Sequence, residues 1–316
     1  MDNQKYCPTM YMMIGLPASG KSYYAETLCK NMLSPCLIIS SDSIREELFG
    51  DVNCQTENDK VFDVLHKRII NNLKRGYSVI YDATNLNKKR RIAFLQSLNK
   101  LNVCKVGILM ATPYDICLYN NEKRERKVPE DVIKRMREHF QPPHKHEGFD
   151  YVDIVYNGDY NNYTPKLFGD DGILHNFNQM NEHHQLTLEE HCLKASEILQ
   201  NIFFIDELSP LNIAARLHDI GKYYTQTRLN IHGEFDGNYH YYNHQCVGAY
   251  ECLFYINNVI LLNERKLYIS NLIYYHMNPY MSWKQSEKAK ERDRKLIGEK
   301  MYNDILMLHA ADVYAH

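Results

Sequence analysis

The first half of the chain alternates short apolar runs with segments of helical periodicity. The apolar runs are typical of strands and lie at 10–14, 36–39, 77–81, 103–110 and 151–156. Helical patterns separate them, at 22–33, 58–75, 88–101 and 129–140. Strands that are apolar throughout and alternate with helices predict an α/β fold, with a parallel sheet covered by helices on both faces.

The second half of the chain shows no comparable strand signal. Its apolar residues recur at helical spacing over 188–202, 212–217, 249–262, 266–276 and 302–314, so we expect it to be nearly all helical. Residues 158–182 are polar and rich in turn-forming residues, which is typical of a linker. The pattern therefore predicts an α/β domain at 1–157, a linker at 158–182 and an all-α domain at 183–316.

The composition is that of a globular protein. The chain has 316 residues, of which 44% are hydrophobic and 24% charged, a length that suits two domains and a balance that excludes wholesale disorder. It has neither 18 consecutive apolar residues nor a charged-then-apolar leader, so we expect no membrane insertion and no export. The nine cysteines form no C-x-x-C pair, which predicts reduced thiols and a cytoplasmic location.

Charge is distributed unevenly between the two halves. Residues 1–157 carry 23 Lys and Arg against 19 Asp and Glu, a net of +4, whereas residues 158–316 carry 14 against 20, a net of −6. The formal net charge of −2 therefore does not exclude a nucleic-acid partner. A protein that contacts only the end of a nucleic-acid strand needs no long basic groove. Eleven of the 15 histidines lie in the acidic half, which makes it a candidate metal-binding region.

A phosphate-binding motif follows the first predicted strand. The segment Gly15-Leu-Pro-Ala-Ser19-Gly20-Lys21-Ser22 fits G-x-x-x-x-G-K-[ST] and opens a predicted helix, as this motif requires. The loop backbone and the helix N-terminus would hold the phosphates of ATP or another NTP. Lys21 should reach the β- and γ-phosphates, and the Ser22 hydroxyl should ligate Mg²⁺.

Polar side chains follow the next two strands at the same edge of the predicted sheet. After the second strand, Asp42 is placed to accept the proton of an attacking hydroxyl and Arg45 to hold an anionic group. The ordinary alternative is a helix N-cap followed by a surface arginine. After the third strand, Asp82 is placed to act on Mg²⁺ through water, and Thr84 or Asn85 to contact substrate.

A basic run at 123–127 precedes the last predicted helix of this half. Such a run is usually a solvated face, but phosphoryl transfer needs arginines that close over the γ-phosphate. We therefore interpret Arg124 and Arg126 as part of a lid.

Together, these motifs resemble the polynucleotide 5′-kinase branch of the P-loop phosphotransferases, over about residues 8–157. The resemblance implies that Asp42 is the general base and that Arg45 contacts the nucleic-acid end. It also implies that Arg124 and Arg126 clamp the nucleotide phosphates.

The second half contains a series of histidines and aspartates at or near predicted helices. The members of the series are His191, His218, Asp219, His244, His276 and Asp312. Their wide separation suits ligands from several helices that converge on one core. Lys222, one turn beyond His218, is placed to stabilise phosphate charge. Taken alone, His244 or His276 is more typical of an ordinary buried histidine.

This series resembles the HD phosphohydrolase superfamily, over about residues 183–316. The resemblance implies that four core ligands, His191, His218, Asp219 and Asp312, hold one divalent transition metal. The further histidines allow a second ion, with Asp219 between the two. The implied activity is metal-dependent removal of phosphate from an ester.

The two implied activities oppose each other on a small molecule but act on different ends of a broken nucleic acid. The sequence therefore predicts an end-healing enzyme, with RNA favoured. It would phosphorylate 5′-hydroxyl ends and remove a 3′-phosphate or a 2′,3′-cyclic phosphate. One alternative is a nucleoside, sugar or nucleotide-sugar kinase fused to a nucleotide phosphohydrolase. The other is a nucleotide-sensing regulatory protein.

Overall fold

The computed structural model describes residues 7–54, 56–158, 164–179, 186–257 and 261–316. The chain folds into two compact units. The first consists of residues 1–129 and 147–158, and the second of residues 130–146 and 159–316. No helix in the described part of the chain is long and apolar enough to cross a membrane.

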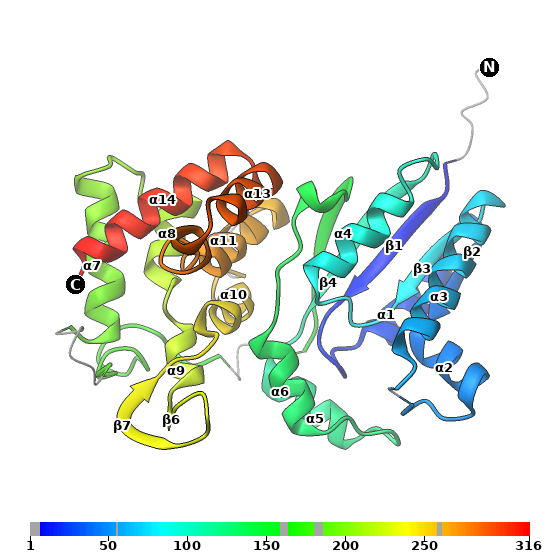
Figure 1. Ribbon diagram of the computed structural model, residues 1–316, viewed down its shortest axis with the longest axis horizontal. Helices are drawn as coiled ribbons and strands as arrows, with labels where there is room; N and C mark the ends of the chain where they lie inside the picture. Colours follow the sequence, from blue (N-terminus) through cyan, green and yellow to red (C-terminus); the bar gives the residue numbers. More distant parts are fainter. Residues whose placement is uncertain (1–6, 55, 159–163, 180–185, 258–260) are drawn as a thin grey trace. The chain divides into compact units, whose positions relative to one another are not determined.

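The first unit contains a five-stranded parallel sheet in the order β2-β3-β1-β4-β5 (Figure 1). Its strands are β1 (Thr9–Ile14), β2 (Cys36–Ser40), β3 (Ser78–Asp82), β4 (Cys104–Ala111) and β5 (Tyr151–Tyr156). In the central strand, Met12 pairs with Tyr81 on one side and Gly107 on the other. The parallel sheet that the sequence predicts is confirmed.

Helices cover both faces of this sheet. They are α1 (Lys21–Asn31), α2 (Ser41–Phe49), α3 (Asn58–Lys74), α4 (Lys88–Ser97) and α5 (Tyr114–Glu122). Successive residues of β3 face opposite sides, as strand geometry requires. Ile80 packs in a buried cluster with Ala25 of α1, while the Tyr81 ring meets His66 of α3 and Phe94 of α4. The sequence pattern did not predict α2 and α5, which have nine residues each.

The strand order places the motifs of the first unit at one edge. From β1 the chain runs to β2, returns to β3 beside β1, and then crosses to β4 on the other side of β1. The carboxyl ends of β1 and β3 are therefore neighbours at the point where the connections diverge, which is the usual ligand crevice of such sheets.

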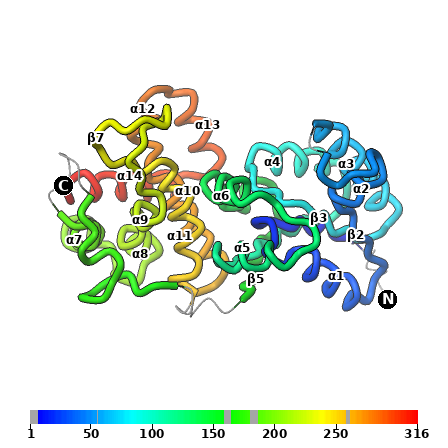
Figure 2. The backbone as a smooth tube through the Cα atoms, turned by 90° about the horizontal axis from the view of Figure 1, so that it is seen from below, coloured from blue at the N-terminus to red at the C-terminus, as the bar shows by residue number. Residues whose placement is uncertain are grey.

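The second unit is built mainly from helices. They are α6 (Glu130–Glu138), α7 (Leu188–Asn201), α8 (Pro210–Leu217), α9 (Gly221–Thr225), α10 (His244–Tyr255), α11 (Asn263–Tyr275), α12 (Ser282–Gln285), α13 (Glu287–Ile297) and α14 (Glu299–Tyr314). Helices α7, α8 and α14 pack against one another, and α10 packs on α11 (Figures 1 and 2).

A hairpin of β6 (Thr227–Leu229) and β7 (Phe235–His240) corrects the expectation of an all-helical second half. Most of its residues are exposed. The hairpin therefore lacks the alternation of apolar and polar residues by which a half-buried strand is recognised in a sequence. Backbone pairing and a hydrogen bond of 2.9 Å from Arg228 Nε to Tyr239 Oη hold the two strands together.

Two segments lie in a different unit from the one that the sequence pattern assigns. Helix α6 was expected in the first domain, yet Arg137 Nη2 lies 2.7 Å from Glu251 Oε1 of α10. Of the expected linker 158–182, residues 164–179 belong to the second unit and bury Leu167 and Leu174. Residues 159–163 and 180–182 lie outside the described part of the chain.

A buried ion pair gives a test of stability in the first unit. Arg91 Nε and Nη2 each lie 2.7 Å from a carboxylate oxygen of Glu147, and both side chains are fully buried. We expect Glu147→Ala to lower the free energy of unfolding of this unit by about 3–5 kcal/mol, because the Arg91 charge would be left buried without its partner. Urea unfolding followed by circular dichroism measures the loss.

The control for this variant is Glu47→Ala. Glu47 pairs with Arg68 in solvent, where an ion pair contributes little. Equal losses in the two variants would contradict the importance of the buried pair.

Candidate functional site

The predicted phosphate loop joins β1 to α1 in the first unit. Gly20 has φ +89°, and a Cβ atom there would lie 2.6 Å from Asn157 Nδ2. Only glycine adopts this conformation readily and leaves that space free. The N-terminus of α1 follows directly, so its unpaired N–H groups and its dipole lie at the end of the loop.

Side chains from distant segments fix the backbone of the loop. Thr112 Oγ1 and Asn157 Nδ2 donate to the Ser19 carbonyl at 2.9 and 3.0 Å, and Asn120 Nδ2 donates to the Ala18 carbonyl at 3.3 Å. The sequence analysis did not identify these three residues. Thr112 follows β4, Asn157 follows β5 and Asn120 lies on α5, so no local spacing marks them.

Lys21 is buried and folds back over the loop. Its Nζ donates to the Leu16 carbonyl at 2.5 Å, and burial lowers its pKa to about 8, although the Asp82 carboxylate opposes the shift. Ser22 Oγ donates to Asp82 Oδ2 at 2.7 Å. The structure thus brings together the two side chains that the sequence assigns to Mg²⁺, and their oxygens suit that ion.

Thr84 and Asn85 support the loop through the backbone. The Thr84 carbonyl accepts a hydrogen bond of 3.0 Å from the Gly15 N–H, and Asn85 Nδ2 donates to the Met13 carbonyl at 2.8 Å. Both residues therefore tie the end of β3 to the end of β1. Their predicted contact with substrate stays a prediction.

Asp42 and Arg45 lie together at the start of α2. Arg45 Nη1 donates to Asp42 Oδ1 at 2.8 Å, and Arg45 is buried. The cap of α2 is Ser40, whose hydroxyl accepts from the Asp42 N–H at 3.2 Å. The alternative of an N-cap followed by a surface arginine therefore does not describe this pair.

The two arginines of the basic run have different surroundings. Arg126 Nη1 donates to Asp42 Oδ2 at 2.6 Å, so both oxygens of that carboxylate contact a guanidinium. Arg126 Nε also donates to Asn53 Oδ1 at 3.0 Å. Arg124 is exposed, and its charge adds to the effect of burial in lowering the pKa of Lys21. Their predicted role as a phosphate clamp stays a prediction.

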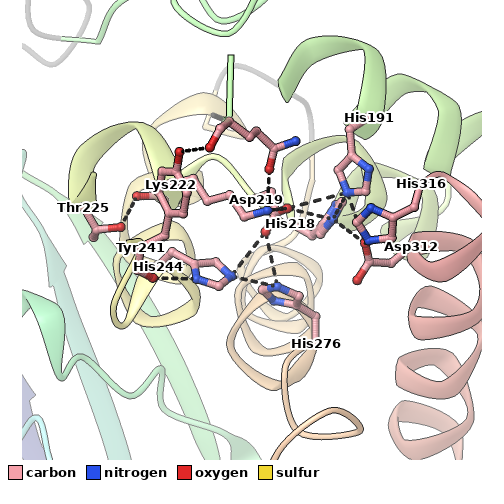
Figure 3. A network of polar contacts seen from close by, with 12 residues as sticks. His191, His218, Asp219, Lys222, Thr225, Tyr241, His244, His276, Asp312 and His316 are labelled. Atoms are coloured by element: carbon pink, nitrogen blue, oxygen red, sulfur yellow. Dashed lines mark hydrogen bonds and ion pairs between the residues drawn. The ribbon is translucent and has the colours of Figure 1, made fainter. Parts of the chain in front are cut away.

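The second unit contains a buried cluster of six metal-ligand side chains (Figure 3). It forms two groups of three: His191, His218 and Asp312, and then Asp219, His244 and His276. The members lie on α7, α10 and α14 and just beyond α8 and α11. All six predicted ligands are thus brought together.

The first group is compact. His191 Nε2 lies 3.1 Å from Asp312 Oδ1 and 3.2 Å from His218 Nε2, and His218 Nε2 lies 3.5 Å from Asp312 Oδ1. In the second group, the Nε2 atoms of His244 and His276 lie 3.3 Å apart. Such spacings leave room for a single ion in the middle of each group.

Asp219 faces both groups. Its Oδ1 lies 3.3 Å from His244 Nε2 and 3.5 Å from His276 Nε2. Its Oδ2 lies 3.6 Å from His191 Nε2 and 3.5 Å from His218 Nε2. One carboxylate can therefore offer an oxygen to each of two ions.

The break between α8 and α9 explains how adjacent His218 and Asp219 share one site. Helix α8 ends at Leu217 and α9 begins at Gly221, so the pair does not lie on one regular helix. At Gly221, a Cβ atom would lie 1.9 Å from the His244 carbonyl oxygen. Glycine at this position allows α10 to approach the break closely.

Backbone carbonyls orient three of the histidines. The Nδ1 atoms of His218, His244 and His276 lie 2.7, 2.9 and 2.6 Å from the carbonyl oxygens of Ala215, Tyr241 and Ile273. A carbonyl only accepts, so Nδ1 carries the proton and Nε2 offers its lone pair to the centre. This is the tautomer that binds a metal through Nε2.

The electrostatics of the cluster also fit a cation. Burial alone would raise the pKa of Asp219, but Lys222 and His218 hold it well below its usual range. Burial likewise opposes ionisation of Asp312, yet the adjacent side chains of His191 and His218 keep the pKa of that carboxyl well below its usual range. Two carboxylates with several imidazole nitrogens form a donor set for divalent transition metals.

Tyr280 and Gln179 are contacts of this cluster that the sequence analysis missed. Tyr280 Oη donates to Asp312 Oδ2 at 3.0 Å, which leaves Oδ1 for the histidines. Lys222 Nζ lies 2.7 Å from Asp219 Oδ2 and donates at 2.7 Å to Gln179 Oε1. No motif in the sequence marks either residue, because each lies beside the cluster only once the chain has folded.

Comparison with known proteins gives a family model and a curated relative. A family model described as an AAA domain matches residues 10–143. The L-seryl-tRNA(Sec) kinase of Methanococcus maripaludis is 28% identical over 217 residues, which cover 67% of this chain and 82% of that protein. Together with the phosphate loop and the parallel sheet, these matches support a kinase-like P-loop domain.

Solved structures show weaker likenesses. The Pnkp1/Rnl/Hen1 RNA repair complex matches with 19% identity and a TM-score of 0.37, over 43% of this chain and 44% of that one. A gluconokinase from Sinorhizobium meliloti matches with 15% identity and a TM-score of 0.35, over 49% of this chain and 86% of that one. At these TM-scores, neither likeness supports a conclusion about activity.

The pKa of Lys21 predicts a proton linkage to nucleotide binding. With a pKa of about 8, about half of the free protein carries a neutral lysine at pH 8. ATP favours the charged form, so its binding at pH 8 should take up protons, and its affinity should fall as the pH rises further. Isothermal titration in buffers of different ionisation enthalpy measures the uptake.

Lys21→Arg is the control for this linkage, because arginine stays protonated throughout the range. If wild type shows no buffer dependence at pH 8, the lowered pKa of Lys21 is wrong.

The position of Asp219 predicts how metal content responds to substitution. We expect the wild-type chain to bind two Mn²⁺ ions, one in each group of ligands. Asp219→Ala should lose both because its oxygens face both groups, whereas His276→Ala should lose about one. Equilibrium dialysis with mass-spectrometric metal analysis gives the counts.

His232→Ala, an exposed position in the hairpin, is the matched control and should retain both ions. Equal losses in Asp219→Ala and His276→Ala would contradict the shared position of Asp219.

Proposed function

We propose that this protein heals nucleic-acid ends, phosphorylating 5′-hydroxyls and removing 3′-phosphates or 2′,3′-cyclic phosphates, with RNA as the favoured substrate. The observation that carries the proposal is the presence of two complete sets of groups in one chain. Asp42 with Arg45 lies in the unit that holds the phosphate loop, and the second unit holds the six-member histidine–aspartate cluster.

In the kinase reaction, Asp42 accepts the proton of the attacking hydroxyl as the oxygen bonds to the γ-phosphorus and the bond to ADP breaks. Arg45 holds the carboxylate in place from its buried position and, as the resemblance implies, would contact the substrate end. Lys21 and the loop backbone neutralise charge on the phosphates, and Ser22 with Asp82 would hold Mg²⁺.

Arg126 has a second role in this scheme. Because it donates to Asp42 Oδ2, its movement toward the nucleotide would free that oxygen for the substrate hydroxyl. Binding of ATP would then couple closure of the lid to exposure of the base.

In the phosphohydrolase reaction, the six-member cluster would hold one or two divalent transition metals, in keeping with its resemblance to the HD superfamily. Bound ions would supply an activated water and neutralise phosphate charge. Asp219 would position its two oxygens toward both groups of ligands, and Lys222, with Nζ 2.7 Å from Asp219 Oδ2, would add positive charge beside the phosphate.

The choice of substrate rests on compatibility between the two reactions. On one small molecule the second reaction would undo the first, whereas on a cut strand they act on opposite ends. The name of the M. maripaludis relative specifies a kinase that acts on a tRNA, which supports an acceptor hydroxyl carried by RNA. A small-molecule kinase fused to a nucleotide phosphohydrolase uses the same groups and differs only in the acceptor.

A panel of acceptors tests the proposal. The protein is incubated with γ-labelled ATP and, in parallel, a 5′-hydroxyl RNA, its DNA counterpart, seryl-tRNA, nucleosides and sugars. We expect label on the 5′-hydroxyl RNA, and a loss of about 10²–10⁴-fold in Asp42→Asn, because a general base contributes that much. The matched control is Glu46→Gln, an exposed carboxyl on the same helix, which should keep full activity.

The same RNA with a 3′-phosphate or a 2′,3′-cyclic phosphate tests the second reaction, in the presence of Mn²⁺, Ni²⁺ or Co²⁺. Asp219→Ala should abolish phosphate release and leave the kinase intact, while Asp42→Asn should do the reverse. Label only on nucleosides or sugars would establish the small-molecule alternative. Phosphate release that survives Asp219→Ala would refute the assignment of the cluster.

A further inference from the structure

Gln179 reaches the histidine–aspartate cluster from the segment that the sequence predicts as a linker. Its side chain is fully buried. Oε1 accepts a hydrogen bond of 2.7 Å from Lys222 Nζ, and the main-chain carbonyl accepts one of 2.6 Å from Tyr241 Oη. Lys222 and Tyr241 both belong to the surroundings of the cluster (Figure 3).

The contact with Lys222 determines the orientation of the amide. An ammonium group only donates, so the oxygen of Gln179 must face it and the NH₂ group must point away. That Nε2 atom is buried, and no hydrogen-bond partner for it lies among the residues that the structure describes. A buried donor without a partner is unfavourable, so a ligand that pairs with it would be favoured.

The surroundings of Gln179 specify the charge of that ligand. Lys222 Nζ contacts Gln179 Oε1 and also lies 2.7 Å from Asp219 Oδ2, so the amide is two contacts away from the carboxylate that faces both groups of ligands. Both the Lys222 ammonium and the NH₂ group are hydrogen-bond donors, and the positive charge beside the amide favours an anionic oxygen as the acceptor for Nε2.

The segment that carries Gln179 is held firmly in the second unit. Asn178 pairs with Thr187 in an antiparallel bridge, and the Leu188 N–H donates to the Phe177 carbonyl at 3.0 Å. Farther back, Glu189 Oε1 accepts from the Gly169 N–H at 2.9 Å. These bonds orient the amide before any ligand binds, which lowers the entropic cost of binding.

We propose that Gln179 is a substrate-binding residue of the histidine–aspartate cluster, and that its NH₂ group donates to a non-bridging oxygen of the substrate phosphate. This inference rests on the proposed phosphohydrolase function. It also means that the catalytic unit includes residues N-terminal to 183, the limit that the sequence pattern assigns to the second domain.

Two substitutions of Gln179 separate its donor from its acceptor. Gln179→Glu keeps an oxygen for Lys222 and removes the NH₂ group, while Gln179→Met has a similar volume and removes both. Gln285→Glu makes the same amide-to-carboxylate change at an exposed position of α12 and is the matched control. Each is studied as the full chain loaded with Mn²⁺.

The measurements are metal content, thermal unfolding, affinity for inorganic phosphate by isothermal titration, and steady-state hydrolysis of a 3′-phosphorylated RNA. In both Gln179 variants we expect unchanged metal content, and Gln179→Glu, which keeps an acceptor for Lys222, should also keep the melting temperature of wild type. Their phosphate affinity should fall at least about tenfold, since one hydrogen bond to a charged oxygen is lost. KM for the RNA should rise, and the control should match wild type throughout.

Three results would overturn the proposal: phosphate affinity equal to that of wild type in Gln179→Met, loss of metal in both variants, or absence of phosphate binding by the wild-type protein. If wild type binds phosphate through Gln179 but hydrolyses no RNA end, the binding role of Gln179 stands and the proposed activity of the cluster fails.

Discussion

The position of one carboxylate, that of Asp219, constrains most of the second unit. Its two oxygens lie between two sets of imidazoles, and the nearest nitrogens are 3.3–3.6 Å away. To bring those imidazoles together, helices α7, α10, α11 and α14 must converge where α8 ends. Burial of two carboxylates and four histidines is costly unless they pair with one another or bind a cation. These helices must therefore pack so that the six polar side chains contact one another.

The phosphate loop of the first unit depends on a comparable constraint. Its motif supplies glycines and Lys21, but its backbone is held by Thr112, Asn120 and Asn157. These side chains donate to loop carbonyls and so restrain the loop backbone. In both units, therefore, residues outside the recognisable motif give the site its geometry, and this preorganisation favours a charged ligand.

Local patterns were sufficient to predict much of the fold and of the site composition. All five strands of the parallel sheet were predicted within one residue at each end, since strands of a sheet covered by helices on both faces are largely apolar. The phosphate loop and the six members of the histidine–aspartate cluster were also found from spacing. The exposed hairpin of β6 and β7 was missed because its residues bury little surface and carry no alternation.

The sequence by itself determined the strand and helix periods, the phosphate loop and the identity of the titratable groups, because each of these depends on neighbours along the chain. The tertiary structure decided which groups meet: α6 packs with the second unit through Arg137 and Glu251, Asp219 faces two sets of ligands, and Arg126 binds Asp42. It also brought Gln179 to Lys222, 43 residues apart in sequence. Such contacts form through space between residues that no period relates, so they follow only from the packing of whole elements.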